Sequence, residues 1–344
     1  MDSGMRVPHT VDRRETAISG ALPAGPHAQQ SWSRYWDGNA GKAPEQAISE
    51  GRFGPVLRRH WEAVFKNSAA FPENGRMLDL ACGAGVVGRL ARDRVGGGID
   101  IVGVDLSSAA ARQAETGLVG NIALLPFGPG CFDRIVSQFG IEYAGLPAFR
   151  EAARVLTPAG QFSAVVHVKH GAIWRENATC LDIVQRTMDA GILHKCRLRL
   201  QTGYKLDRGA AAPAAFDRRT AAFEAAARAV LVALRDAADC AAKAYIGQLL
   251  PDLFDIVSRR QNYAPEQLED WMTGQEHTLE AYAFRMNAML DASMSVEEVR
   301  EAAGILSAAG DSKVAIDALS LGNHPDPAAW TVRVCRGRKL RARH

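Results

Sequence analysis

Long apolar runs are missing from this 344-residue sequence, and no stretch approaches the roughly 18 uninterrupted apolar residues of a membrane span. The first 30 residues are polar, contain Pro8, Pro23 and Pro26, and lack the apolar core of a signal peptide. We therefore expect a soluble chain without a membrane partner, and residues 1–30 are predicted to form a mobile tail.

Clustered cysteines are also missing. The six cysteines are scattered without a C-x-x-C pair, and only Cys196 has a histidine close by, His194. Disulfide frameworks and structural zinc sites need closer spacing, so we predict neither, and no metal. A reducing cytoplasm is the expected compartment. A strong net charge is missing too. The formal net charge of +3 indicates no particular partner, and we expect no nucleic-acid partner.

What the sequence does contain is an alternation of short apolar runs with helical stretches. A helical stretch near 148–156 ends at Pro158-Ala159-Gly160, and another is expected at 296–309. Such alternation is typical of a mostly parallel sheet with helices on both faces. The predicted strands occupy 76–81, 100–105, 132–137, 161–168, 313–320 and 330–335.

The alternation stops between about 171 and 293, where long helical stretches take over, including 214–250 and 266–291. The predicted fold is therefore α/β: a Rossmann-like, doubly wound, mostly parallel seven-stranded sheet with a large helical insertion after strand five. The predicted parts are N-terminal helices and a cofactor-binding part at 31–170, the insertion or lid at 171–293, a last helix and strands at 294–336, and a basic tail at 337–344.

The stretch 78–88, LDLACGAGVVG, follows a predicted strand with a G-x-G-x-x-G pattern at 83–88. Glycines at this spacing form a strand-to-helix turn whose backbone approaches a ligand closely. Asp105 ends the next strand, where an acid can accept ribose hydroxyls. A dinucleotide places its pyrophosphate on such a turn, and Asp79 would repel it. Asp79 suits a cationic amine instead, which disfavours an NAD-dependent dehydrogenase.

These residues resemble the class I S-adenosylmethionine-dependent methyltransferases, of the small-molecule type (methyltransferase type 11/25-like). Asp79 to Gly85, DLACGAG, resembles their first motif, D-x-x-x-G-x-G, and Asp105-Leu106-Ser107 resembles their second. Three further stretches follow in the family's order, so the resemblance covers about 76–168. They are GNIALLPF at 120–127, FDRIVS at 132–137 and RVLTPAG at 154–160.

The resemblance implies S-adenosylmethionine as cofactor and a role for each matching residue. Gly83 and Gly85 would let the backbone approach the methionine end, and Asp79 would hold the amino group, directly or through water. Asp105 would accept the ribose hydroxyls, with Leu106 packed on the adenine. Either acid could instead serve the fold, Asp79 with a backbone partner and Asp105 as a helix cap. Asn121 stands where the family has an aspartate, and its oxygen could accept from the adenine amine. The predicted cofactor contacts also include Ala81, Cys82, Ile122 and Ser137.

The chemistry that the family performs is displacement at an already activated sulfonium methyl. Most of the catalysis should therefore come from positioning, and a base is needed only when the nucleophile must lose a proton. His167 and His170, at the end of strand five, are the candidate bases, although each could simply pack. Candidate acceptor contacts are Tyr35, Glu142 and Tyr143.

The kind of acceptor is predicted from the sequence after strand four, from the aromatic residues of the N-terminal helix and from the insertion after strand five. Phe139-Gly140 and the R-V-L-x-P stretch resemble quinone-biosynthesis C-methyltransferases, but Glu142-Tyr143 replaces their usual Arg-Asn, which disfavours a quinone. Trp32, Tyr35 and Trp36 share one helix face and are expected to cover the site. Apolar side chains of the insertion would form a second cover, or else the insertion's own core. They are Tyr282, Phe284, Met286, Met289, Leu290 and Met294.

We therefore expect S-adenosylmethionine-dependent methyl transfer to a small, apolar or aromatic acceptor by in-line displacement. An RNA or protein methyltransferase and a non-catalytic adenosylmethionine-binding module remain alternatives. The insertion is also a candidate homodimer interface.

Overall fold

The computed structural model describes residues 26–38, 53–66, 71–72, 74–308, 311–320 and 326–337. Residues 1–25 and 338–344 of the two predicted tails lie outside this part of the chain. Residues 26–30 belong to helix α1 (Pro26–Gly38) rather than to the tail. Proline suits this position because its fixed φ is already helical and its missing N–H would have no partner in the first turn.

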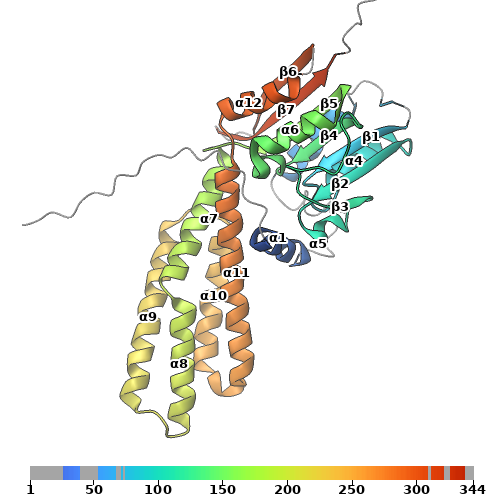
Figure 1. The fold of residues 1–344 in the computed structure, drawn as a ribbon. Helices are drawn as coiled ribbons and strands as arrows, with labels where there is room; N and C mark the ends of the chain where they lie inside the picture. The colour runs from blue at the N-terminus through green and yellow to red at the C-terminus, as the bar shows by residue number, and fades with distance from the viewer. Residues whose placement is uncertain are drawn as a thin grey trace, which may run out of the picture.

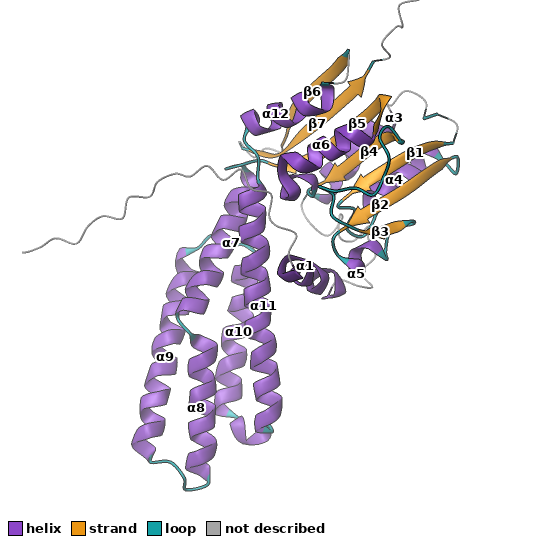
Figure 2. Ribbon diagram, viewed as in Figure 1, coloured by secondary structure: helices purple, strands orange, loops and turns teal. Residues whose placement is uncertain are grey.

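Seven strands form one sheet in the order β3-β2-β1-β4-β5-β7-β6 (Figure 2). The first five run parallel, and β7 runs antiparallel to both β5 and β6. This confirms the predicted doubly wound, mostly parallel fold. The strand order reverses between β1 and β4, which is where such sheets open a crevice for ligands. The strands are β1 (Gly75–Leu80), β2 (Ile99–Asp105), β3 (Gly117–Val119), β4 (Phe132–Gln138), β5 (Leu156–His167), β6 (Ser312–Ser320) and β7 (Pro327–Arg336).

Helices cover both faces because the strand residues alternate between them. Met77 of β1 packs in a core with α3 (Gly54–Lys66) and α4 (Val86–Val95). Its neighbours Leu78 and Leu80 point the other way, into a core with α6 (Gly145–Val155) and α12 (Val296–Ser307). Burying both faces removes the sheet's apolar side chains from water, which is the main stabilising term of such a fold.

Two local predictions were wrong. Residues 158–160 do not form a turn before a strand, because β5 already begins at Leu156. Its pairing with β4 shifts register between Phe132 and Arg134, so the proline lies in an irregular part of the ladder where a missing N–H is tolerated. The alanine-rich stretch at 107–114, whose composition favours a helix, forms only a single turn, α5 (Ser108–Ala111), and the short strand β3 that follows was not predicted. Ser107 does cap α5, accepting from the Ala110 N–H at 3.3 Å.

The insertion after β5 forms a helical bundle that stands away from the sheet (Figure 1). Its alanine-rich stretch is two helices rather than one, interrupted at 237–240. The bundle has its own core, which includes Ile183, Phe223 and Leu253, and Tyr282 packs against it. Met294 instead belongs to the core of the sheet. The helices are α7 (Ala172–Asp189), α8 (Ile192–Asp207), α9 (Pro213–Asp236), α10 (Ala241–Ser258) and α11 (Pro265–Ala292).

The two ends of the insertion are tied together next to β5. Val168 and Met294 form an isolated parallel bridge. The Met294 N–H donates to the His167 carbonyl at 2.9 Å, and the Lys169 N–H donates to the Met294 carbonyl at 3.0 Å. The chain therefore leaves the sheet and returns to it at one place. In the part of the chain that the structure describes, no helix has the length and apolarity to cross a bilayer.

Candidate active site

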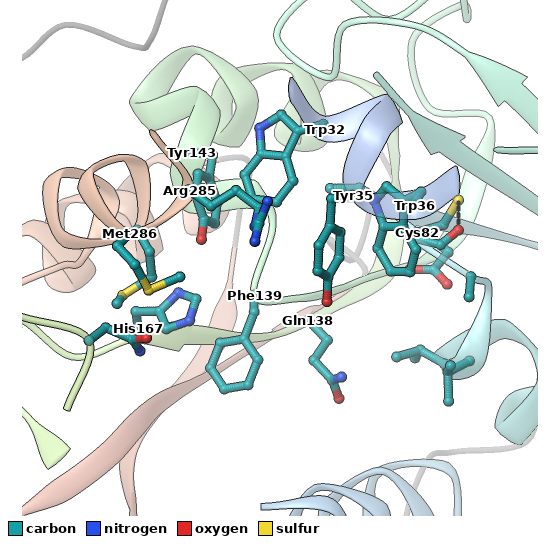
Figure 3. Close-up of a pocket in the computed structure, with 18 residues that line it drawn as sticks. Trp32, Tyr35, Trp36, Cys82, Gln138, Phe139, Tyr143, His167, Arg285 and Met286 are labelled. Carbon is teal, nitrogen blue, oxygen red and sulfur yellow. Dashed lines mark hydrogen bonds between the residues drawn. The ribbon is translucent and has the colours of Figure 1, made fainter. Parts of the chain in front are cut away.

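A cavity of about 350 Å³ lies beyond the carboxyl ends of β1, β4 and β5. Its walls come from the glycine turn after β1, from the ends of β4 and β5, and from four helices, α1, α4, α7 and α11 (Figure 3). It therefore lies at the reversal of strand order. It brings together seven of the predicted site residues: Tyr35, Asp79, Ala81, Cys82, Gly83, Tyr143 and His167.

The floor of the cavity is a pair of tight turns. Ala81 (φ 52°) and Gly83 (φ 51°) both have left-handed backbone after β1, and such a conformation costs energy at a residue with a Cβ. A Cβ on Gly140, after β4, would lie only 2.4 Å from the Ala81 Cβ. Glycine is thus required at 140 so that the two turns can meet. Gly85 (φ 72°) precedes α4 and does not line the cavity.

Asp79 is a buried carboxylate at the wall of this cavity. Its side chain accepts the Gly88 N–H at 3.2 Å, which fixes it against the start of α4. Burial raises the pKa of Asp79 to about 7, although the bond from Gly88 opposes the rise. A buried carboxylate with so few partners is stabilised by any cation that enters the cavity. The site therefore suits a ligand that carries an ammonium group, and the contact of Asp79 with the cofactor stays a prediction.

Asp105 is buried as well, but its oxygens bind the protein's own backbone. They accept the Gly83 N–H at 2.9 Å and the Ser107 N–H at 2.8 Å. Burial raises the pKa of Asp105, and these backbone bonds oppose the rise. Asp105 thus fixes the glycine turn and the backbone just before α5, whose N-cap is Ser107, and its contact with the ribose stays a prediction. It does not line the cavity.

The other predicted contacts to adenine and ribose also lie outside the cavity lining. The Asn121 side chain accepts the Ala123 N–H at 2.9 Å, and Ile122 is part of the sheet core. Ser137 donates to the Leu80 carbonyl at 2.8 Å and accepts the Ile141 N–H at 3.0 Å. Their contacts to the cofactor, and that of Leu106, stay predictions. The short segment after α5 packs on the glycine turn: a Cβ on Gly85 would lie 3.0 Å from the Ala114 Cα.

The role of Asp105 can be tested by removing its carboxylate. Asp105→Ala leaves two buried N–H groups unpaired, and each such group costs roughly 1–3 kcal/mol. We expect a loss of about 2 kcal/mol or more of unfolding free energy, together with weaker cofactor binding. Urea unfolding and calorimetry measure the two effects. Asp100→Ala is the control, because Asp100 is exposed and pairs with Arg76 at the surface. Equal stability of the two variants would contradict this assignment.

The strongest chemical feature of the cavity is a histidine–glutamate pair. Glu142, in the short 3₁₀ helix η1 (Ile141–Ala144), lies 2.7 Å from the Nδ1 of His167 at the end of β5. The same Glu142 oxygen accepts the His167 N–H at 3.2 Å. Its side chain is fully buried. A carboxylate in this position holds the proton on Nδ1, which leaves Nε2 with a free lone pair. Phe139 stacks on the imidazole, with the ring centres 4.3 Å apart.

This geometry revises two sequence predictions. Glu142 was expected to contact the acceptor, but its carboxylate is turned away from the cavity and used to orient His167. His170 was the second candidate base, yet its exposed ring packs on Trp174 at 4.5 Å and does not line the cavity. The reason is a left-handed turn at His170 (φ 62°), which directs the chain away from β5 and into α7.

Helices α1 and α11 both contribute side chains to the lining of the cavity. Trp32, Tyr35 and Trp36 of α1 all line it, as their shared helix face predicted. A Cβ on Gly83 would lie 2.7 Å from the Trp36 ring, so this ring covers the glycine turn. Sequence reasoning missed Arg285 of α11, whose guanidinium lies 4.9 Å from the centre of the Tyr35 ring. It also missed Gln138 and Asn177.

The fold and the site define a class of protein: a doubly wound α/β domain that binds a nucleoside cofactor at a glycine turn between two acidic strand ends. Residues 78–164 match the family model described as "Methyltransferase domain". This match agrees with the resemblance of the motifs in this span to class I S-adenosylmethionine-dependent methyltransferases, whose cofactor is S-adenosylmethionine. Asp79 and the Gly83 turn fit the methionine end of that cofactor, which carries an ammonium group.

Two curated relatives of this chain are named as methyltransferases. The chain is 31% identical over 125 residues to a 2-phytyl-1,4-naphtoquinone methyltransferase of Thermosynechococcus vestitus, covering 33% of this chain and 55% of that protein. It is 33% identical over 128 residues to the ubiquinone/menaquinone biosynthesis C-methyltransferase UbiE of Xylella fastidiosa, covering 32% and 51%. The chain thus spans about half the length of the curated relatives it matches.

Solved structures align over less than half of the chain. Geranyl diphosphate C-methyltransferase from Streptomyces coelicolor A3(2) has a TM-score of 0.34 and 21% identity, covering 43% of this chain and 67% of that one. The [4+2]-cyclase SpnF has a TM-score of 0.30 and 25% identity, covering 35% and 48%.

Proposed function

We propose that this protein transfers the methyl group of S-adenosylmethionine to a small aromatic acceptor whose reacting atom carries a proton. One observation carries the proposal: His167, which is hydrogen-bonded to Glu142, lines the same 350 Å³ cavity as Asp79 and the glycine turn. A candidate base and a carboxylate suited to the ammonium group of the cofactor thus share one cavity. The names of the relatives, which are methyltransferases of quinone rings, support an aromatic acceptor.

Different residues of the cavity bind the cofactor, accept the proton and hold the acceptor. When bound, S-adenosylmethionine supplies a methyl group activated by the positive sulfur. Asp79 holds the ammonium group of the cofactor. His167 accepts the acceptor's proton at Nε2, and Glu142 stabilises the imidazolium that results, because its carboxylate is 2.7 Å from Nδ1. The aromatic walls hold a flat acceptor and exclude water. Positioning of this kind can lower the activation free energy by up to roughly 7–11 kcal/mol.

The size and cover of the cavity favour a small acceptor. A volume of about 350 Å³ is at the low end for ligand pockets, and it must hold part of the cofactor as well. One or two rings fit this space better than a large substrate. An RNA or protein acceptor would need an open face, whereas α1 and α11 line the cavity here. We propose on these grounds that both helices act as the cover, and the bundle's role as a homodimer interface stays a prediction.

The proposal is tested by binding and turnover together. S-adenosylmethionine and S-adenosylhomocysteine should bind in calorimetry, whereas NAD should not, because Asp79 would repel its pyrophosphate. Methyl-labelled cofactor incubated with small-molecule extracts should then yield a labelled, low-molecular-weight aromatic product. Binding without any labelled product would favour a non-catalytic module, and label recovered in RNA or protein would favour a macromolecular acceptor.

A further inference from the structure

Arg285 places a positive charge inside an otherwise aromatic and apolar wall. It comes from the last third of α11, is half-buried, and lines the cavity beside Met286 and Met289. Its guanidinium carbon lies 4.9 Å from the ring centre of Tyr35 and 5.6 Å from that of Tyr282. Burial lowers the pKa of Arg285, so the charge is held at some cost.

Arg285 lacks the acidic partner that Arg197 and Arg260 of the insertion have. Among the described residues, no carboxylate lies within ion-pair distance of its guanidinium. Arg197 is paired with Glu276 at 2.8 Å, and Arg260 with Asp207 at 2.6 Å. Ring faces compensate a buried guanidinium only in part, and buried charges in proteins are normally paired. The missing partner of Arg285 is therefore best supplied by a ligand.

The position of Arg285 decides which ligand supplies the anion. In Figure 3 its guanidinium lies between Tyr143 and Tyr35, on the same side of the cavity as His167 and Met286. The glycine turn and Trp36, where the methionine end of the cofactor fits, lie at the opposite side of that view. Tyr143 is in edge contact with His167, with ring centres 6.0 Å apart. Arg285 thus faces the acceptor rather than the cofactor.

We propose that the acceptor is an aromatic carboxylic acid whose carboxylate pairs with Arg285 while its reacting atom faces His167. The inference rests on the proposed methyl transfer. A single guanidinium matches a single carboxylate, which it can bind through two parallel hydrogen bonds. The rings of Trp32, Tyr35 and Tyr143 accommodate the flat body of such an acid, and Met286 and Met289 adapt to its outline. A neutral acceptor would leave the guanidinium unpaired.

Binding of matched probes tests this assignment without requiring the natural acceptor. The full chain is titrated with 4-hydroxybenzoate and with the neutral 4-hydroxybenzamide, each with and without S-adenosylhomocysteine. We expect the wild type to bind the acid at least about tenfold more tightly than the amide. Arg285→Met should bring the two affinities within about threefold of each other. Arg285→Lys keeps the charge but not the planar fork, so it should fall between them.

A matched control comes from the exposed face of the bundle. Arg228→Met removes a guanidinium of α9 that pairs with Glu224, far from the cavity, and it should keep the preference for the acid. Thermal unfolding checks that each variant is folded. The proposal is overturned if the wild type binds acid and amide equally, or if Arg285→Met keeps the preference. It is also overturned if Arg285→Met weakens S-adenosylhomocysteine binding with the acid preference intact, since Arg285 would then serve the cofactor.

The design separates this inference from the proposed function. If S-adenosylhomocysteine fails to bind, the methyltransferase proposal fails, while the titrations without it still decide whether Arg285 selects an acid. If S-adenosylhomocysteine binds and the probes show no preference, the function stands and the inference about the acceptor falls.

Discussion

Replacing Asp79 with asparagine is expected to abolish tight binding of S-adenosylmethionine and, at the same time, to stabilise the ligand-free protein at pH 8. The substitution removes a buried charge but keeps an oxygen that accepts the Gly88 N–H, so the local structure should survive. Removal of a buried, uncompensated charge stabilises the fold, whereas the ammonium group of the cofactor loses its counter-ion.

The sign of the pH dependence follows from the raised pKa of Asp79, about 7 in the folded protein. A raised pKa means that the neutral carboxyl stabilises the fold fully below the unfolded pKa, near 4. This stability is lost as the pH rises through 7. Asp79→Asn should therefore change stability little at pH 4 and raise it by roughly 2–4 kcal/mol at pH 8.

Unfolding of the two proteins across pH 4–8, with calorimetry at each pH, measures both effects. Wild-type affinity for the cofactor should rise as the pH passes through 7 and Asp79 ionises, and the variant should show no such rise. Asp100→Asn, at an exposed carboxylate of β2, is the control and should behave as the wild type. A variant that still binds the cofactor tightly would show that Asp79 does not hold the ammonium group.

Loss of the base should have the second large effect. His167→Ala is expected to lower kcat by about 10²–10⁴-fold, the usual contribution of a general base. Affinity for S-adenosylhomocysteine should stay unchanged, because His167 lies on the acceptor side of the cavity. Glu142→Gln should give a smaller loss, since the amide oxygen still orients the imidazole but no longer stabilises its charged form. Initial rates with the acceptor identified by labelled turnover measure these effects.

The matched control is His170→Ala, three residues along the chain. Its ring packs on Trp174 outside the cavity, so kcat should not change. A loss as large as that of His167→Ala would mean that His170 moves into the site during turnover. Unchanged rates in His167→Ala would instead show that the acceptor needs no base and that positioning alone drives the transfer.

The sequence predicted what depends on local pattern. Strand ends, the glycine turn and the two acids follow one another within a short span, and the sheet places them together. Glu142 and His167 could not be paired in this way, because they meet only when the carboxyl ends of β4 and β5 become neighbours. Arg285 carries no local signal at all, since a single arginine in an apolar helix usually faces solvent.

Other misses also have physical reasons. Helical propensity in the stretch after Ser107 was overridden at Gly117, where even a Cβ would lie 1.8 Å from the Ala111 carbonyl oxygen. The chain turns tightly there, and α5 ends after one turn. The ribose contact of Asp105 stays a prediction, but its two backbone partners could not be predicted, because a motif describes only position and residue type. It does not tell which backbone N–H groups have already taken the carboxylate oxygens.

The tie between Val168 and Met294 has a consequence for how such a protein can change. Both ends of the bundle meet at one place beside β5, although α7 and α11 also contact β7, η1 and α1, so we expect that the bundle can be exchanged without disturbing the strand order. The two ends of the bundle meet at the carbonyl of His167, so we expect a different bundle inserted there to place its own side chains near the base. Acceptor choice can then evolve, or be engineered, independently of cofactor recognition. A chimera carrying a foreign bundle between residues 169 and 294 should keep its affinity for S-adenosylhomocysteine while accepting a different substrate.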